Sequence, residues 1–288
     1  MPIIFDLVDA YLSPLSILDD YARGIAKYFS GQLSGSIKPF SLHVRDFCVD
    51  SSAVICSSIE QEEIIKSYNS NTHVILDSHE EIPFITGEKS RIPTPNSYRI
   101  LWEGQPATIR GVKLISPVLN ELSKTRDLQL DFVTDKTYFQ FLNKYIKKET
   151  FDLLKKDLGA VGGFANLIPW TPENLVNRAQ TSDIAIIPID LSVPMQRLKP
   201  ENRLLIMWRL GLPCLTSPSP AYKRVAHKAG VSAISNTPAD WFENLDKLLK
   251  DPDFAADEIV KGQNYLRENH NKSILLKKWD AAFESVIG

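Results

Sequence analysis

Residues 186–216 read IIPIDLSVPMQRLKPENRLLIMWRLGLPCLT, and this stretch decides the fold class. The apolar run Ile184–Ile189 predicts a buried strand, which ends in a loop that carries Asp190. A charged cluster then opens an apolar helix that ends at Gly211, and Pro213–Thr216 predicts a further short strand. Strand, helix and strand in this order form the unit of a parallel α/β sheet.

The charged cluster before that helix is the leading candidate for a binding site. It contains Lys199, Glu201, Asn202 and Arg203. In an open α/β sheet, ligands bind where strands end and the following helices begin. A helix N-terminus flanked by Lys and Arg suits a phosphate or diphosphate. Basic residues oppose the helix dipole there, so we favour anion binding over a merely solvated helix end for Lys199, Asn202 and Arg203.

The same alternation of apolar runs and amphipathic segments extends along the whole chain. In the first part it predicts strands at Ile3–Val8, Ala53–Cys56 and His73–Leu76. Residues 86–97, TGEKSRIPTPNS, then predict a linker because they carry prolines and a glycine and have almost no apolar pattern. Strands expected after it are Tyr98–Trp102, Leu128–Val133, Asn166–Ile168, Asp183–Ile189, Pro213–Thr216 and Val231–Ile234, and helices are expected near 110–124, 137–157, 172–180, 200–210, 219–229 and 238–250. Two trailing helices, Phe254–Asn269 and Ser273–Val286, need not belong to the sheet.

We therefore predict an α/β protein with two Rossmann-like domains. Residues 1–90 form the first domain, which is short or incomplete, and residues 91–288 form the second domain with its trailing helices. Three strands before the linker amount to half of a doubly wound domain.

Composition narrows the class of protein. Of the 288 residues 43% are hydrophobic and 24% charged, which is ordinary for a globular chain. The net charge of -2 gives no basic field, so nucleic acid is not an expected partner. The three cysteines lack metal-ligand spacing, which favours reduced thiols in a cytoplasmic protein. No apolar run approaches the roughly 20 residues of a membrane span, and the N-terminus does not read as a signal peptide.

Several landmarks follow one another from about Arg99 to the C-terminus. They are ILWEG (100–104), IRGVKLISPVLNEL (109–122), LDFVTD (130–135), LIPWTPENLVNRAQTSDIAIIPID (167–190) and KPENRLLIMWRLGLPCLTS (199–217). In order and spacing they resemble the donor-binding domain of GT-B glycosyltransferases that use nucleotide-sugars. Residues 1–85 resemble the later part of the acceptor-side domain of these enzymes, in a weaker match.

This resemblance implies transfer of a hexose from a nucleotide-sugar to a saccharide or lipid-linked acceptor, in polysaccharide or glycoconjugate synthesis, with retention of configuration. Donor binding is expected at Gly104, Arg110, Lys199, Asn202 and Arg203. Fixed cations would stabilise the departing diphosphate. Gly104 would permit close approach of the backbone.

Other candidates have weaker support. Asp9 and His79 are the candidate catalytic residues, although capping of the following turn is the favoured account of Asp9, and His79 is a lone histidine. Trp170 could stack on the donor base or belong to the core. No Asp-x-Asp motif follows a strand and no His/Cys cluster occurs, so we expect no metal and no other cofactor.

Two departures from the family keep alternatives open. The first part lacks the glycine-rich strand–helix turn, and Leu198 and Ile206 stand where many retaining members have a pair of glutamates. A non-catalytic or truncated GT-B domain, which binds a nucleotide-sugar or a partner subunit, is therefore the alternative. A nucleotide-sugar epimerase is a third interpretation. Peripheral contact with the inner membrane face is considered for Lys144, Lys147, Lys148, Lys155 and Lys156, beside the simpler account of a solvated helix face.

Overall fold

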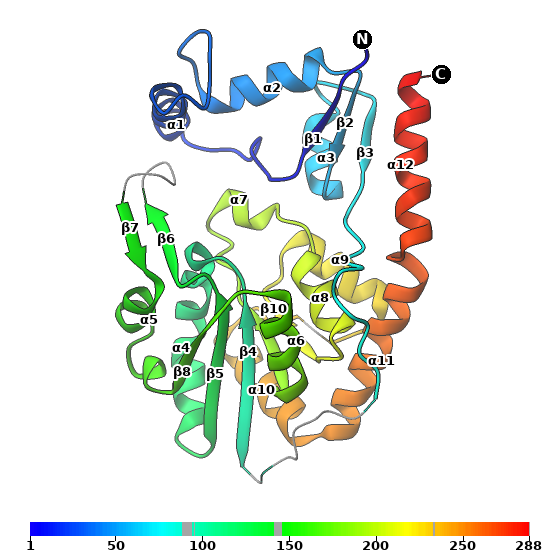
Figure 1. The fold of residues 1–288 in the computed structure, drawn as a ribbon. Coiled ribbons are helices and arrows are strands. Elements are labelled where there is room, and N and C mark those ends of the chain that lie inside the picture. Colours follow the sequence, from blue (N-terminus) through cyan, green and yellow to red (C-terminus); the bar gives the residue numbers. More distant parts are fainter. Residues whose placement is uncertain (88–93, 95, 141–145, 233, 288) are drawn as a thin grey trace.

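In the computed structural model of the chain, the described residues are 1–87, 94, 96–140, 146–232 and 234–287. They form two parallel sheets, one above the other in Figure 1, each with helices around it. The predicted α/β class, with a short first unit, is confirmed.

The first sheet has three parallel strands in the order β1-β2-β3 within the described part of the chain. The strands are β1 (Ile4–Leu7), β2 (Ala53–Cys56) and β3 (Thr72–Val74). The central strand β2 reads AVIC and is buried at every position, as a parallel strand covered on both faces requires. All three strands were expected from the sequence.

Three helices belong to this first unit, namely α1 (Ile17–Phe29), α2 (Phe40–Asp50) and α3 (Ile59–Ile65). The Ser58 side chain caps α3 by accepting a hydrogen bond from the backbone N–H of Gln61. This places the start of α3 just beyond the carboxyl end of β2, on the side that faces the second sheet (Figure 1).

The second sheet has five parallel strands in the order β10-β9-β4-β5-β8. They are β4 (Ser97–Glu103), β5 (Asp127–Thr134), β8 (Ala165–Pro169), β9 (Ile184–Ile187) and β10 (Cys214–Thr216). Trp102 and Phe132 are fully buried between strands and helices, with ring centroids 5.2 Å apart. Because the strands run parallel, their carboxyl ends share one edge, and this edge faces the first sheet.

Most helices around the second sheet match the sequence prediction. The helices are α4 (Arg110–Ser123), α5 (Thr150–Leu158), α6 (Pro172–Thr181), α7 (Pro194–Arg197), α8 (Asn202–Arg209), α9 (Pro220–Ala229), α10 (Pro238–Lys250) and α11 (Pro252–Asn269), with 3₁₀ turns at Pro106–Thr108 and Gly159–Phe164. Of these, α5 begins later than expected, and the short α7 was not expected. Proline occupies the first helical turn of α6, α9, α10 and α11, where its missing N–H costs no hydrogen bond.

The last helix, α12 (Lys272–Ile287), returns to the first sheet. Its Ala282 is completely buried in a cluster with Ile55 and Ile75, and Trp279 packs against this cluster. A hydrogen bond of 3.1 Å joins the Ser285 hydroxyl to Nε2 of His73. The two ends of the chain therefore lie at the same end of the molecule (Figure 1).

Two sequence expectations were wrong. Residues 137–140 and 146–149 do not belong to a helix but form two antiparallel strands, β6 (Thr137–Gln140) and β7 (Ile146–Glu149), and the helix α5 begins only at Thr150. Aromatic and β-branched residues at positions 137–139 favour a strand, which outweighs the helical spacing of the longer segment. The expected strand Val231–Ile234 is reduced to one bridge between Thr216 and Ile234.

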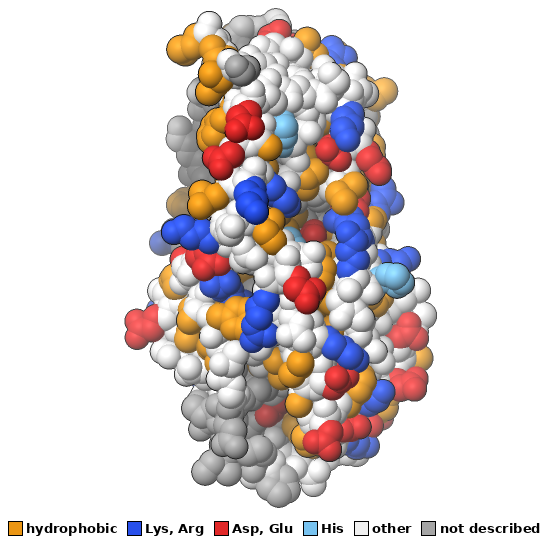
Figure 2. Space-filling model, turned by 90° about the vertical axis from the view of Figure 1, so that its right-hand side faces the viewer, with side chains coloured by type: hydrophobic (Ala, Val, Ile, Leu, Met, Phe, Trp, Pro, Cys, Tyr) orange, Lys and Arg blue, Asp and Glu red, His pale blue; other side chains and the backbone are white. Residues whose placement is uncertain are grey.

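The face that carries α11 and α12 mixes both signs of charge, with Lys and Arg most numerous across its middle (Figure 2). None of the helices that the structure describes is both long and apolar enough to cross a bilayer. Lys144 and most of the expected linker, residues 88–93 and 95, lie outside the described residues.

Candidate functional site

A cleft of ≈ 380 Å³ lies between the two sheets. The first sheet contributes residues that follow β1, among them Asp9 and Tyr11. The second sheet contributes the ends of β4 and β9 and the segment from α7 to α8. Residues of this second group are Glu103, Gly104, Gln105, Thr108, Pro188, Ile189, Gln196, Lys199, Pro200, Asn202 and Arg203. Four of the five predicted donor-binding residues thus line one cavity, at the edge where open α/β sheets bind ligands.

Arg203 is the most firmly held cation of the cleft. Its guanidinium donates to the backbone carbonyl of Glu103 and lies 3.4 Å from the Glu103 carboxylate. It also stands over the Trp102 ring, 5.2 Å from the centroid. The other Glu103 oxygen accepts a hydrogen bond of 3.2 Å from the Trp170 indole. These contacts hold the positive charge of Arg203 in a fixed position at the start of α8.

Lys199 connects the two sides of the cleft. Its ammonium group lies 3.7 Å from the Asp9 carboxylate across the gap between the sheets. Both side chains are about one-third exposed, so the pair is accessible to a competing ion. One residue earlier, the Leu198 carbonyl accepts hydrogen bonds of 3.4 Å from Ser58 and Gln61 at the start of α3. The loop before α8 is therefore docked on the first unit.

Two glycines allow the backbone to pack closely around the cleft. A Cβ on Gly104 would lie 3.0 Å from the Thr108 hydroxyl and 3.2 Å from the Arg203 guanidinium carbon. A Cβ on Gly111 would lie 2.1 Å from the carbonyl oxygen of Pro188, at the end of β9. The first turn of α4 thus touches the backbone that leads into the cleft.

We expect Gly111→Ala to lower the free energy of unfolding by about 1–3 kcal/mol, because a backbone carbonyl cannot rotate away as a side chain can. Urea denaturation measures the loss. The matched control is Gly163→Ala, since nothing lies within 4 Å of a Cβ built there. Equal stability of the two variants would contradict the close approach.

Arg110 does not line the cleft. Its guanidinium is half exposed and lies 2.5 Å from Asp190, in the loop after β9. Hydrogen bonds from Ser192, followed by the pairing with Arg110, hold the pKa of Asp190 below its ordinary value. Arg110 therefore fixes the loop beside the cleft in this structure, and its role in donor binding stays a prediction.

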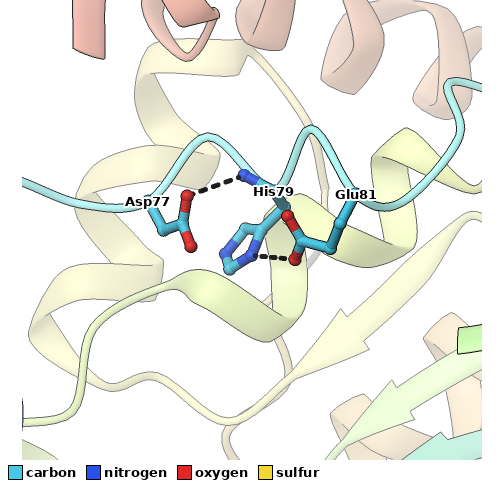
Figure 3. Close-up of side chains that lie close together, drawn as sticks. All are labelled: Asp77, His79 and Glu81. Carbon is cyan, nitrogen blue, oxygen red and sulfur yellow. Dashed lines mark hydrogen bonds and ion pairs between the residues drawn. The ribbon is translucent and has the colours of Figure 1, made fainter. Parts of the chain in front are cut away.

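His79 lies outside the cleft lining, in the connection that follows β3, with Asp77 and Glu81 beside it (Figure 3). Asp9 lines the cleft, so the structure separates the two candidate catalytic residues. Trp170 is 44% exposed and joins the site through Glu103 only.

Sequence reasoning missed the buried charges behind the cleft. Arg224 of α9 pairs with Glu60 of α3 and lies 3.5 Å from Glu201, the residue that precedes α8. Glu201 is 6% exposed, and burial raises the pKa of its carboxyl, which Arg224 partly opposes. No local motif signals a pair so far apart in sequence. Glu103, by contrast, stands in the ILWEG landmark directly before the predicted Gly104.

The two positions of the missing glutamate pair are also structurally defined. Leu198 directly follows α7, and Ile206 lies inside α8. Neither side chain can accept a hydrogen bond. The charged and amide side chains that line the cleft around the start of α8 are those of Lys199, Asn202 and Arg203.

No model of a known protein family and no curated protein sequence matches the chain. Solved structures do match it. The chain aligns with WaaG, a glycosyltransferase involved in lipopolysaccharide biosynthesis, over 100% of its own length and 76% of that chain, at 14% identity and a TM-score of 0.60. With HepE from Anabaena it aligns over 99% of its own length and 72% of that chain, at 11% identity and a TM-score of 0.67. With sucrose-phosphate synthase from Thermosynechococcus elongatus it aligns over 91% of its own length and 65% of that chain, at 12% identity and a TM-score of 0.62. The chain therefore has the GT-B glycosyltransferase fold, two facing Rossmann-like units with a cleft between them, of which the first unit is short.

Proposed function

We propose that the protein is a glycosyltransferase that moves a hexose from a nucleotide-sugar to a saccharide or lipid-linked acceptor. The observation that carries this proposal is the cleft between the sheets, in which Lys199, Asn202 and Arg203 meet Gly104. HepE, which shares the fold, was crystallised in complex with UDP and glucose. Synthesis of a polysaccharide or glycoconjugate in the cytoplasm is the proposed setting.

The chemistry of the leaving group fits these side chains. Breaking the bond between the sugar and a nucleoside diphosphate builds negative charge on the diphosphate, and fixed cations stabilise it. Arg203 is held in place by Glu103 and Trp102. Lys199 would exchange its weak, exposed contact with Asp9 for a phosphate oxygen. We expect these residues to supply the stabilising charge without a metal.

Donor and acceptor would enter from opposite units. The second unit holds the cations, whereas Asp9 and Tyr11 come from the first. Once Lys199 turns to the diphosphate, the Asp9 carboxylate is free to accept a hydrogen bond from the acceptor hydroxyl. We place the division between the units at residue 90, and propose that the two units approach each other when donor and acceptor bind.

We infer retention of configuration at the transferred sugar. A trehalose-6-phosphate synthase studied for glycosyl transfer with retention shares the fold at a TM-score of 0.64. The anomeric configuration of the first product, read by NMR, tests this inference.

A panel of UDP- and GDP-sugars tests the function itself. We expect one of them to bind to the purified full chain in a saturable manner by calorimetry, and to release its nucleoside diphosphate when a saccharide acceptor is supplied. Failure of every donor to bind to the folded protein would refute the proposal.

A second candidate is a non-catalytic GT-B domain that binds a nucleotide-sugar or a partner subunit. The three-stranded first sheet of the described chain and the apolar Leu198 and Ile206 favour it. Binding of a donor without release of diphosphate to any acceptor would support this candidate.

Asp9→Asn should separate binding from transfer. We expect about a 10–100-fold fall in kcat, because a poorly oriented acceptor loses much of the benefit of proximity, with little change in donor affinity. Steady-state kinetics and calorimetry measure the two effects. Asp6→Asn is the matched control, since Asp6 lies in β1, shortly before Asp9, but outside the cleft lining. An unchanged kcat in Asp9→Asn would remove Asp9 from the site.

A further inference from the structure

A second polar cluster lies on the connection between β3 and β4, apart from the cleft. Asp77, His79 and Glu81 alternate along this segment, and one donor atom from each lies within 4.8 Å of the other two. The backbone turns at this cluster, where the Ile82 N–H donates a hydrogen bond of 2.9 Å to the His79 carbonyl. Figure 3 shows the imidazole between the two carboxylates.

The His79 side chain has unused bonding capacity. His79 is 8% exposed, and its Nε2 is buried without a hydrogen-bond partner in the described part of the chain. Its Nδ1 lies 3.4 Å from Glu81, and its backbone N–H donates to Asp77 at 3.2 Å. A buried ring nitrogen without a partner is costly unless something binds it.

The two carboxylates are free to move toward a common ligand. Asp77 and Glu81 are both exposed. Ligands of one zinc ion, each at about 2.1 Å, lie roughly 3–4 Å apart. A small rotation of the two exposed side chains would bring the three donor atoms to that spacing.

Contacts with Arg209 of α8 hold the loop that carries the cluster. The buried Arg209, at the end of α8, donates to the carbonyl of Ile82 and lies 3.3 Å from Glu80. The Ile85 N–H also donates to the Arg209 carbonyl at 2.8 Å. The other end of α8 carries Asn202 and Arg203, which line the cleft. A ligand at the cluster would therefore stiffen the loop that joins the first sheet to α8.

We propose that Asp77, His79 and Glu81 bind one divalent transition-metal cation, which clips the connection between the two units. One imidazole and two carboxylates suit Zn²⁺, with Mn²⁺ weaker, whereas Mg²⁺ prefers oxygen ligands alone. The site is structural, lies outside the donor cleft and takes no part in the transfer reaction. It departs from the sequence expectation of no metal, which considered His/Cys spacings and treated His79 as isolated.

The test uses the full chain after removal of metals with a chelator. Calorimetric titration with ZnCl₂ should give one site, tighter than the site for MnCl₂, and bound Co²⁺ should show a d–d absorption band. A hundredfold excess of Zn²⁺ over Kd should raise Tm by about 5 °C.

Variants decide whether these three residues are the ligands. His79→Asn keeps a residue that tolerates the positive φ of 53° at this position and removes the imidazole. We expect it to weaken Zn²⁺ binding about tenfold or more, as should Asp77→Asn and Glu81→Gln. Glu80→Gln is the matched control, because it removes a carboxylate of the same loop that faces Arg209.

Zn²⁺ affinity that is equal in the unmodified chain and in His79→Asn would overturn the proposal. So would a loss in Glu80→Gln as large as in Glu81→Gln. Circular dichroism confirms that each variant is folded before titration, and the Co²⁺ band separates a lost ligand from a merely altered loop.

Discussion

Lys199→Ala combined with Arg203→Ala is expected to weaken nucleotide-sugar binding about a hundredfold or more. Each cation would make charge-assisted hydrogen bonds to the diphosphate, worth about 1.5–3 kcal/mol apiece. Two such losses exceed the roughly 2.8 kcal/mol that corresponds to a hundredfold change in Kd. Calorimetry with the donor identified in the panel measures the effect.

The single variants separate binding from folding. Lys199 is about one-third exposed, and its ion pair among the described residues is the long contact to Asp9, so we expect its loss to leave the fold intact. Arg203→Ala also leaves the partly buried Glu103 without its cation, so the stability of this variant must be checked by urea denaturation. Lys223→Ala, an exposed lysine of α9, is the matched control and should bind as the unmodified chain does. Donor affinity unaltered in the double variant would place the donor elsewhere.

Arg224→Ala is expected to cost about 3–5 kcal/mol of the free energy of unfolding. The substitution leaves the buried Glu201 and the partly buried Glu60 without the cation that both contact. Breaking a buried ion pair in this way costs more than the pair itself contributes, because the remaining charges stay desolvated. Lys223→Ala, next in sequence and exposed, serves as control here too.

The loss in the free energy of unfolding caused by Arg224→Ala should depend on pH. Burial raises the pKa of Glu201 in the folded chain, and Arg224 opposes this, so the variant has a still higher pKa at Glu201. A folded state with a raised carboxyl pKa binds its proton more tightly than the unfolded state, and stability falls as pH rises above the ordinary value of about 4.3. The difference between the two chains should therefore grow from pH 5 to pH 7.5. A difference in the free energy of unfolding that stays constant over this pH range would show that Arg224 does not affect the pKa of Glu201.

Much of the fold follows from local sequence. Buried strands such as Ala53–Cys56 and Ile184–Ile187 are short apolar runs bounded by polar residues, and periodicity finds them. The antiparallel strands β6 and β7 were missed because the spacing of these segments also fits a helix, and pairs such as Tyr138 with Lys148 decide for strands. Pairing between two strands is a contact that no local pattern encodes.

The candidate site, too, has a part that the sequence predicts and a part that depends on contacts between distant segments. Lys199, Asn202 and Arg203 are neighbours in sequence at a predicted helix start, so the sequence brings them together. Asp9 reaches them only because the first sheet faces the second, and the Asp9–Lys199 contact spans most of the chain. The role of Arg110 could not be read from its position at a helix start, since its partner Asp190 comes from another strand end.

The return of α12 to the first sheet bears on how the protein is made. Ribosomes release β1, β2 and β3 long before residues 272–287 are synthesised, yet Ala282 and Trp279 complete the apolar cover of Ile55 and Ile75. Most multidomain chains fold from the N-terminus during translation. In this chain the apolar face of the first sheet that carries Ile55 and Ile75 stays uncovered until residues 272–287 have been made.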